Sequence, residues 1–373
     1  MAGIYLHIPF CRKACHYCNF HFSTTHQRIP EMVQAIGKEM LLRRDYLNET
    51  VETVYLGGGT PSLLSVTDLE QLLSPLYQQY TVSANAEITL ESNPDDITAA
   101  NLTAWRKLGI NRLSIGIQSF FAQDLQWMNR AHTVQQSIQS IQLAQAEGFH
   151  NITIDLIYGT PGLTDENWEQ NIDTALSLQV PHLSCYALTV EPRTALDKMI
   201  HTGKLLDVDP EQQARQFSIL TQKTAMAGME HYEISNFALP GFRSRHNSSY
   251  WQGKNYLGLG PSAHSFNGQS RQWNVSNNSL YLAALAKEEL PFEVETLTET
   301  QQMNEYIMTG LRTIEGVSLT YLTERWGDSK AHTLRKSAEK YILNGQVRLN
   351  NDHLQLEPSG KFFADGIAAD LFQ

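Results

Sequence analysis

The chain has 373 residues and a formal net charge of −11 at pH 7, with 42% hydrophobic and 18% charged residues. This length predicts one large domain with a smaller one, and the acidic balance provides no positive field for phosphate backbones, so we expect no nucleic-acid partner. No apolar run approaches the roughly 20 residues that span a bilayer and no secretory leader opens the chain, which predicts a cytoplasmic protein without a membrane-spanning segment.

The first half of the chain alternates β-branched or aromatic runs with segments of helical periodicity. The expected strands are residues 3–9, 51–56, 87–91, 112–117, 151–157 and 182–188. The expected helices are residues 31–46, 67–80, 98–108, 134–147 and 165–178, with cap signals at Thr67, Asp96 and Asp165. Such alternation predicts parallel strands with right-handed crossovers. Six units are fewer than the eight of a closed barrel, so we expect an α/β fold with an open (β/α)6 partial TIM barrel.

The alternation stops after Glu191. One more strand is expected at residues 230–235, and the stretch 237–273, rich in Gly, Asn, Ser and aromatics, predicts a long functional loop region. Helices at 299–311, 318–325 and 330–344, a hairpin of 346–349 with 354–356, and a last helix from 359 predict a small, mainly helical domain with a β-hairpin, similar to a winged helix. We therefore expect three parts: residues 1–235, a connecting region 236–296, and a C-terminal domain 297–373.

Three of the four cysteines lie within eight residues, directly after the first expected strand. Cys11, Cys15 and Cys18 stand in the segment CRKACHYC. Three thiolates hold three corners of a 4Fe-4S cluster and leave one iron open, and S-adenosylmethionine (SAM) can fill that corner through its amino and carboxylate groups. The alternative is a structural zinc site with His16 or His21 as the fourth ligand.

Polar groups at the ends of other expected strands favour the cluster. The second strand runs into residues 57–61, GGGTP, whose glycines allow close approach of a ligand to the backbone. Glu91 ends the third strand, Gln118 follows the fourth, and Asp155 lies in the fifth. Each alone could be a helix cap or a satisfied buried group. Because strand ends of a barrel meet at one rim, together they predict a cofactor pocket.

These segments resemble a known family, the anaerobic coproporphyrinogen III oxidase-like radical SAM proteins. The resemblance covers essentially the whole chain through GIYLHIPFCRKACHYCNF, YLGGGTPS, ESNPDD, SIGIQSF, DLIYGTPG, RHNSSYW and LGLGPSAHSF. It implies the open barrel, the small C-terminal domain and cluster ligation by Cys11, Cys15 and Cys18. It also implies SAM contacts at Tyr5, Tyr17, Gly58, Gly59, Thr60, Glu91, Gln118, Arg130 and Asp155, with weaker alignment at Ile157 and Ala187.

The chain departs from the oxidase of this family in two places. The oxidase has a further cysteine two residues after the triplet, where this chain has Phe20, and an N-terminal segment that we expect to be missing here, since Cys11 lies ten residues from the start. The heme-chaperone branch is marked by the pattern His-Asn-x-x-Tyr-Trp, present at residues 246–251. The resemblance thus implies a heme chaperone that delivers heme to acceptor proteins, with membrane-bound respiratory proteins as candidates.

Two other functions stay open as alternatives. One is oxygen-independent oxidation of coproporphyrinogen III by radical SAM chemistry. The other is radical SAM modification of tRNA, which would require a basic face or an RNA-binding module, and the acidic balance argues against it.

The segment around residue 246 also permits a physical interpretation. Neutral imidazole is a good axial ligand for heme iron, and Tyr and Trp offer flat apolar faces. His246 is therefore a candidate heme ligand, with Arg243 and Arg245 available to pair with the propionates. The alternative is a loop histidine that bonds to backbone beside packed aromatics. His264, in PSAHSF, is a second candidate for the heme ligand.

Overall fold

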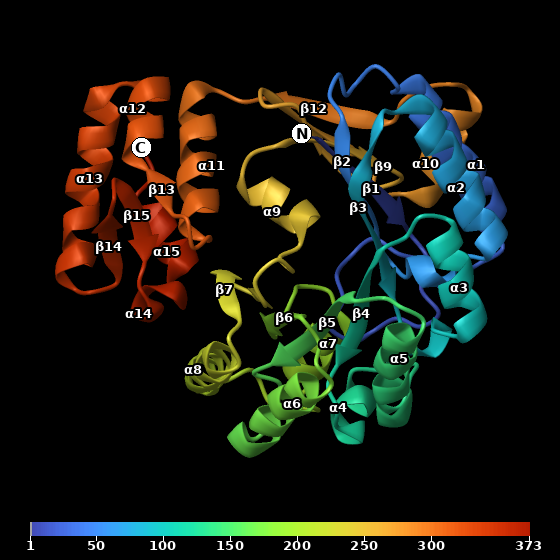
Figure 1. The fold of residues 1–373 in the computed structure, drawn as a ribbon, viewed down its shortest axis with the longest axis horizontal. Helices are drawn as coiled ribbons and strands as arrows, with labels where there is room; N and C mark the ends of the chain where they lie inside the picture. Colours follow the sequence, from blue (N-terminus) through green and yellow to red (C-terminus); the bar gives the residue numbers. More distant parts are fainter. Residues whose placement is uncertain (1) are drawn as a thin grey trace.

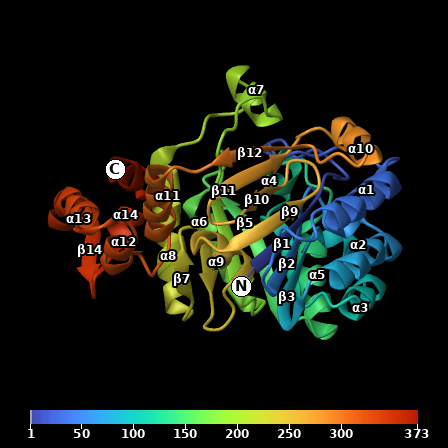
Figure 2. The ribbon, with the colours of Figure 1, turned by 90° about the horizontal axis from the view of Figure 1, so that it is seen from above.

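The computed structural model describes residues 2–373 and is built around one 12-stranded sheet with the order β12-β11-β10-β9-β1-β2-β3-β4-β5-β6-β8-β7. The strands β1 to β6 run parallel, with helices outside them (Figures 1 and 2). Their bounds are Ala2–Ile8, Val51–Gly58, Val82–Ser92, Arg112–Gln118, Asn151–Tyr158 and His182–Ala187. Since β1 and β6 pair with β9 and β8 and not with each other, the barrel stays open, which confirms the predicted fold class.

Five helices of the barrel match the helices predicted from periodicity, with different caps, and three further helices were not predicted. The helices α1 to α8 span Ile29–Leu42, Val66–Gln79, Ala99–Lys107, Ala122–Trp127, Val134–Ala146, Asp165–Ser177, Ala195–His201 and Pro210–Met226. Ser65, not Thr67, caps α2, because Ser65 and Asp68 form a reciprocal capping box. Thr98 and Thr164 take the cap positions expected for Asp96 and Asp165. Short 3-10 turns at Pro61–Leu63 and Pro94–Asp96 follow β2 and β3.

The prediction of a loop at residues 237–273 is wrong, because this stretch adds strands to the sheet. The strand predicted at residues 230–235 is confirmed as β7 Glu230–Glu233. The elements that follow it are β8 Asn236–Ala238, α9 Arg245–Trp251, β9 Asn255–Leu259, β10 His264–Phe266, β11 Ser270–Asn274, α10 Asn278–Ala286 and β12 Phe292–Thr296. β9 pairs in parallel with β1, and β10 to β12 continue antiparallel from it. Among these strands, β9 pairs with β1, about 250 residues earlier, whereas β10 and β11 pair with neighbours that are close in sequence.

The C-terminal residues form a small domain with its own core (Figure 1). Its elements are α11 Glu299–Leu311, β13 Val317–Ser318, α12 Leu319–Trp326, α13 Asp328–Leu343, β14 Val347–Asn350, β15 His353–Leu356, α14 Pro358–Lys361 and α15 Ala364–Asp370. The predicted hairpin is confirmed, and Asn351 and Asp352 form its turn with φ of 45° and 70°. No helix among residues 2–373 is long and apolar enough to cross a bilayer.

Candidate functional site

The cysteine loop leaves the end of β1 and is held against the glycine run after β2. The Gly59 amide donates to the Ile8 carbonyl at 2.9 Å, and the Thr60 amide donates to the Phe10 carbonyl at 2.7 Å. A Cβ on Gly59 would lie 2.6 Å from the Phe10 carbonyl oxygen and 2.7 Å from that of Ile8. The glycine at this position is therefore needed so that the two backbones can approach each other.

The three thiols of this loop are partly buried beside a guanidinium group. Arg130 Nη1 lies 3.4 Å from Cys15 Sγ, while Arg130 Nη2 donates to Asn93 Oδ1 and to the Gly116 carbonyl, both at 2.7 Å. Burial raises the pKa of Cys11 to about 11 and also raises the pKa of Cys18. Thiolates in such surroundings need a strong cationic partner, and iron ions supply that charge. The three thiols with Arg130 thus suit a cluster.

The histidines considered for a zinc site are engaged elsewhere. His16 Nδ1 hydrogen-bonds with the Trp127 carbonyl, and His21 Nε2 hydrogen-bonds with Asn278 Oδ1 at 2.7 Å. Within residues 2–373 no group of three or more His, Cys, Asp or Glu side chains is arranged to hold a single metal ion. One nitrogen of each imidazole is thus already in a hydrogen bond, and a zinc site would have to use the other nitrogen or break that bond.

The barrel rim next to the cysteine loop carries two carboxylates of raised pKa. Glu91 accepts hydrogen bonds from the Tyr55 hydroxyl at 2.8 Å and from the Gly58 amide at 3.1 Å. Removal from water raises the pKa of Glu91 to about 7, and the charge of Asp155 adds to this effect. Burial likewise raises the pKa of Asp155 to about 6. Such carboxylates can accept hydrogen bonds from the hydroxyl and ammonium groups of a cationic ligand.

The other residues expected to contact SAM lie at the ends of the barrel strands or in the cysteine loop. Gln118 ends β4 with φ of 68°, a left-handed conformation that is uncommon for a residue other than glycine. Tyr17 packs with Ile157 in a small apolar cluster on the same side as the cysteine loop. Ala187 ends β6. The Tyr5 hydroxyl bonds with His7 Nδ1 at 3.2 Å, and its ring stacks with that of Tyr55 and also lines the interdomain cavity.

The segment 246–251 forms helix α9, which begins against the barrel. The Glu87 carboxylate accepts from the backbone amides of Arg245 at 3.2 Å and His246 at 3.1 Å. The His246 side chain is buried, with only 1% exposed. Its Nδ1 lies 2.8 Å from Thr53 Oγ1, and its Nε2 lies 2.8 Å from the Tyr250 hydroxyl. Burial lowers the pKa of His246 to about 3, so the ring is neutral.

Trp251, at the end of the same helix, contacts the C-terminal domain. The Arg312 guanidinium lies 5.0 Å from the centre of the Trp251 ring, and it also pairs with Glu233 at 3.0 Å. Arg243 pairs with Glu230 at 3.1 Å and Glu315 at 2.7 Å. This network joins the barrel to the C-terminal domain.

The two arginines that the sequence suggested for heme propionates already have carboxylate partners. Arg243 holds Glu230 and Glu315, as above, and Arg245 pairs with Glu52 at 2.8 Å and donates to the Asn85 carbonyl at 2.7 Å. Arg243 lines the interdomain cavity, whereas Arg245 is outside its lining.

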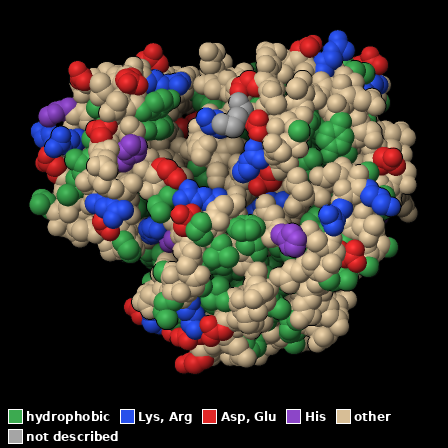
Figure 3. Space-filling view, in the orientation of Figure 1, with side chains coloured by type: hydrophobic (Ala, Val, Ile, Leu, Met, Phe, Trp, Pro, Cys, Tyr) green, Lys and Arg blue, Asp and Glu red, His purple; other side chains and the backbone are tan. Residues whose placement is uncertain are grey.

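A cavity of about 1200 Å³ separates the barrel from the C-terminal domain, and we call it the chamber. Acidic and basic side chains mix along the seam between the two parts (Figure 3). Its barrel wall comes from the cysteine loop, α9 and β9 to β11, and its far wall from α11 and α12. Most residues of the chamber lining were not predicted from the sequence: Tyr256, Phe266, Arg271, Glu305, Tyr306, Tyr321 and Trp326. The concentration of aromatic residues in 250–273 was a signal that could have indicated part of this lining.

Comparisons with known proteins agree with this arrangement. Residues 5–175 match the model of the Radical SAM superfamily, and residues 297–363 match that of the HemN C-terminal domain. The chain is 36% identical over 371 residues to the heme chaperone HemW of Bacillus subtilis, with 98% of each chain covered. It is 34% identical over 375 residues to the heme chaperone HemW of Mycobacterium tuberculosis, covering 99% of this chain and 94% of the relative.

A likeness to a solved structure extends over the whole chain. The Escherichia coli coproporphyrinogen III oxidase HemN superposes with a TM-score of 0.86 at 23% identity, covering 100% of this chain and 90% of that chain, which shows the shared fold. The sequence relatives decide the family, because their identity extends over both domains. The chain belongs to the HemW family of radical SAM proteins.

Proposed function

We propose that this chain is a heme chaperone, which binds heme in the chamber and delivers it to acceptor proteins. The observation that carries the proposal is the chamber itself, which is lined by aromatic and cationic side chains from both domains and is bordered by Phe20 and His21 of the cysteine loop. Apolar walls with a few charged groups suit a flat porphyrin with two carboxylates. The relatives in Bacillus subtilis and Mycobacterium tuberculosis are named heme chaperones, which supports the proposal.

The proposal includes a 4Fe-4S cluster and SAM, as the radical SAM domain implies. Cys11, Cys15 and Cys18 would hold the cluster, with Arg130 beside Cys15. Tyr17, Gly58, Gly59, Thr60, Gln118, Glu91 and Asp155 would hold SAM at the rim. When bound, the cluster supplies the electron that cleaves SAM in radical SAM chemistry.

The proposed setting of the chaperone is the cytoplasm. The acceptors would be heme proteins, with membrane-bound respiratory proteins as candidates, and nucleic acid is not a proposed partner because the chain carries a net charge of −11. Phe20 stands where the oxidase of the family has a further cysteine, and 68% of its side chain is exposed at the chamber. This difference favours the chaperone over the oxidation of coproporphyrinogen III.

The test is a paired assay on anaerobically reconstituted protein with SAM present. Titration with ferric heme should reach one heme per chain, and the loaded protein should pass its heme to an apo form of a b-type cytochrome. The same preparation, given a reductant and coproporphyrinogen III, should form no vinyl product by chromatography. Vinyl product over several turnovers would identify an oxidase and contradict the proposal.

A further inference from the structure

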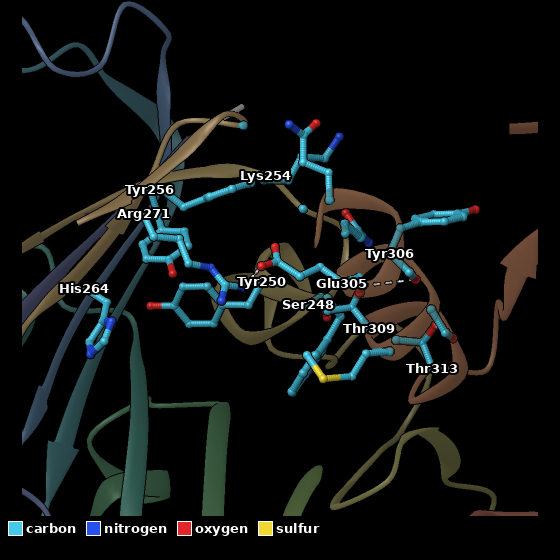
Figure 4. A pocket seen from close by; sticks show the side chains of 18 of the residues that line it. Ser248, Tyr250, Lys254, Tyr256, His264, Arg271, Glu305, Tyr306, Thr309 and Thr313 are labelled. Carbon is cyan, nitrogen blue, oxygen red and sulfur yellow. Dashed lines mark hydrogen bonds and ion pairs between the residues drawn. The ribbon is translucent and has the colours of Figure 1, made fainter. Parts of the chain in front are cut away.

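Three histidines line the chamber, and their ring nitrogens differ in availability. His7 uses both nitrogens, since Nδ1 bonds with the Tyr5 hydroxyl at 3.2 Å and Nε2 with the His21 carbonyl at 2.8 Å. His21 uses Nε2 to bond with Asn278. His264 is exposed to the chamber, and neither of its nitrogens has a hydrogen-bond partner among residues 2–373 (Figure 4). An unpartnered imidazole at a cavity wall can give its lone pair to a metal ion.

His246 has the opposite environment. It is buried behind the wall, with Thr53 on one nitrogen and Tyr250 on the other, and its ring stacks on Tyr55 with centroids 5.1 Å apart. Ligation of heme iron by His246 would require the loss of the bond to Tyr250 and the opening of the wall. The bond instead fixes the Tyr250 ring, which faces the chamber. His246 thus acts as a positioning residue.

The β10–β11 hairpin determines which side chains reach the chamber. His264 pairs with Trp273, and Phe266 pairs with Arg271, so these four side chains share one face of the hairpin. The other face belongs to the interior, where the Arg43 guanidinium donates to Ser265 Oγ at 3.2 Å and to Gln272 Oε1 at 2.6 Å. A slip of one residue would move the imidazole to the wrong face, so Arg43 secures the register.

Cationic groups lie at the same wall. Diagonal positions on one face of an antiparallel pair are roughly 7–8 Å apart, which places the Arg271 side chain near His264. Arg271 pairs with Glu305 of α11 at 2.9 Å across the chamber (Figure 4). Lys254 also lies on the wall of the chamber. The iron ligand and the partners of the propionates are thus provided by one short stretch of chain.

We propose that His264 is the axial ligand of heme iron in the chamber, that Arg271 and Lys254 bind the propionates, and that His246 supports the wall through Tyr250. This inference rests on the proposed function and assigns the heme site to particular side chains. The coordination bond forms from an imidazole lone pair to iron and involves no redox step.

The test separates ligation of the iron from binding of the porphyrin ring. Full-length protein and its His264→Ala variant are titrated with ferric heme and with iron-free protoporphyrin IX, and the heme complexes are followed by absorption and electron paramagnetic resonance. His264→Ala should lose the spectral signature of imidazole-bound heme while binding protoporphyrin IX within about twofold of the unsubstituted protein. Free imidazole should restore the signature. An unchanged signature in His264→Ala would overturn the assignment.

Two histidine variants serve as controls. His246→Gln can still hydrogen-bond with Thr53 and Tyr250 and should keep the signature, as should His332→Ala on the exposed face of α13. Loss of the signature in His246→Gln with His264 intact would also overturn the assignment. If the unsubstituted protein bound neither heme nor protoporphyrin IX, the proposed function itself would fail, and this result differs from a failure of His264 alone.

The propionate contacts have their own control. Arg271→Ala and Lys254→Ala should each weaken protoporphyrin IX binding about tenfold but leave the binding of its dimethyl ester unchanged, since the ester carries no charge. Glu305→Gln removes the partner of Arg271 and keeps the cation, so it should bind protoporphyrin IX at least as tightly as the unsubstituted protein. Equal loss for acid and ester would overturn the role of the two cations.

Discussion

The barrel rim and the chamber both border the cysteine loop, and they are built in different ways. At the rim, Glu91, Asp155 and Arg130 come from consecutive units of the barrel and are held by fixed protein contacts. In the chamber, aromatic faces come from both domains, and His264 has no hydrogen-bond partner among residues 2–373. A site enclosed by one domain suits a cofactor that stays bound, while a site between two domains suits a ligand that must enter and leave. The two sites should therefore be separable by mutation.

The largest expected effect is the loss of the rim site alone. Cys15→Ala removes one of three thiols and should abolish the cluster, so iron and sulfide should fall from about four per chain to near zero. Heme binding should persist, because no chamber side chain is changed. Cys185→Ala, a buried cysteine outside the loop, is the matched control and should keep its iron. Loss of heme binding in Cys15→Ala would mean that the two sites depend on each other.

A methyl group added at Gly59 should destabilise the rim, because it would clash with the backbone of the cysteine loop. Gly59→Ala places a carbon against two carbonyl oxygens of the cysteine loop, so we expect a loss of about 2–3 kcal/mol in the free energy of unfolding and poor cluster retention. Gly37→Ala in α1 has no atom within 4 Å of the added carbon and should be neutral or stabilising. Urea unfolding and iron analysis measure both variants. Equal stability of the two would show that the loop can move away from β2.

A substitution at the contact between the two domains should weaken the chamber and leave the rim site unchanged. Arg312→Ala leaves the buried Glu233 carboxylate without its cation and removes the contact with Trp251, at a cost of about 2 kcal/mol. Limited proteolysis should then cleave between the domains sooner, and heme should bind more weakly while the iron content is unchanged. Lys340→Ala, which breaks an exposed pair with Asp370, should leave stability unaltered. Equal protease resistance in both variants would contradict this role of Arg312.

The last expected effect is a pH dependence that belongs to the rim. Because the pKa of Glu91 is raised to about 7, the folded chain keeps a proton that the unfolded chain releases near pH 4.5, so stability falls as pH rises between these values. Glu91→Gln should reduce this fall by about 1–3 kcal/mol, as urea unfolding at pH 5 and pH 7.5 would measure. Asp155, with a pKa of about 6, should keep a weaker slope below pH 6. An equal slope in Glu91→Gln and the surface control Glu324→Gln would contradict the assignment.

Periodicity in the sequence was enough to predict β1 to β6 and the C-terminal hairpin, because long apolar runs and turn residues determine these elements locally. It was not enough for residues 255–274, where β9 pairs with β1, about 250 residues earlier, and the short strands β10 and β11 extend the sheet beside β9. The candidate site shows the same division. The cysteines and Glu91 could be predicted from motifs, whereas the environments of His246 and His264 depend on which face each ring occupies, and no local pattern encodes that.

The parallel pairing of β9 with β1 has a consequence for biosynthesis. β1 gains one neighbour when β2 emerges from the ribosome, but its other edge stays open until β9 is made, about 200 residues later. At typical translation rates of about 5–20 residues per second, that interval lasts roughly 10–40 seconds. During this time the cysteine loop is attached to a strand that is paired along one edge only. The order in which the chain is made thus leaves this loop on a partly formed sheet until β9 has been synthesised.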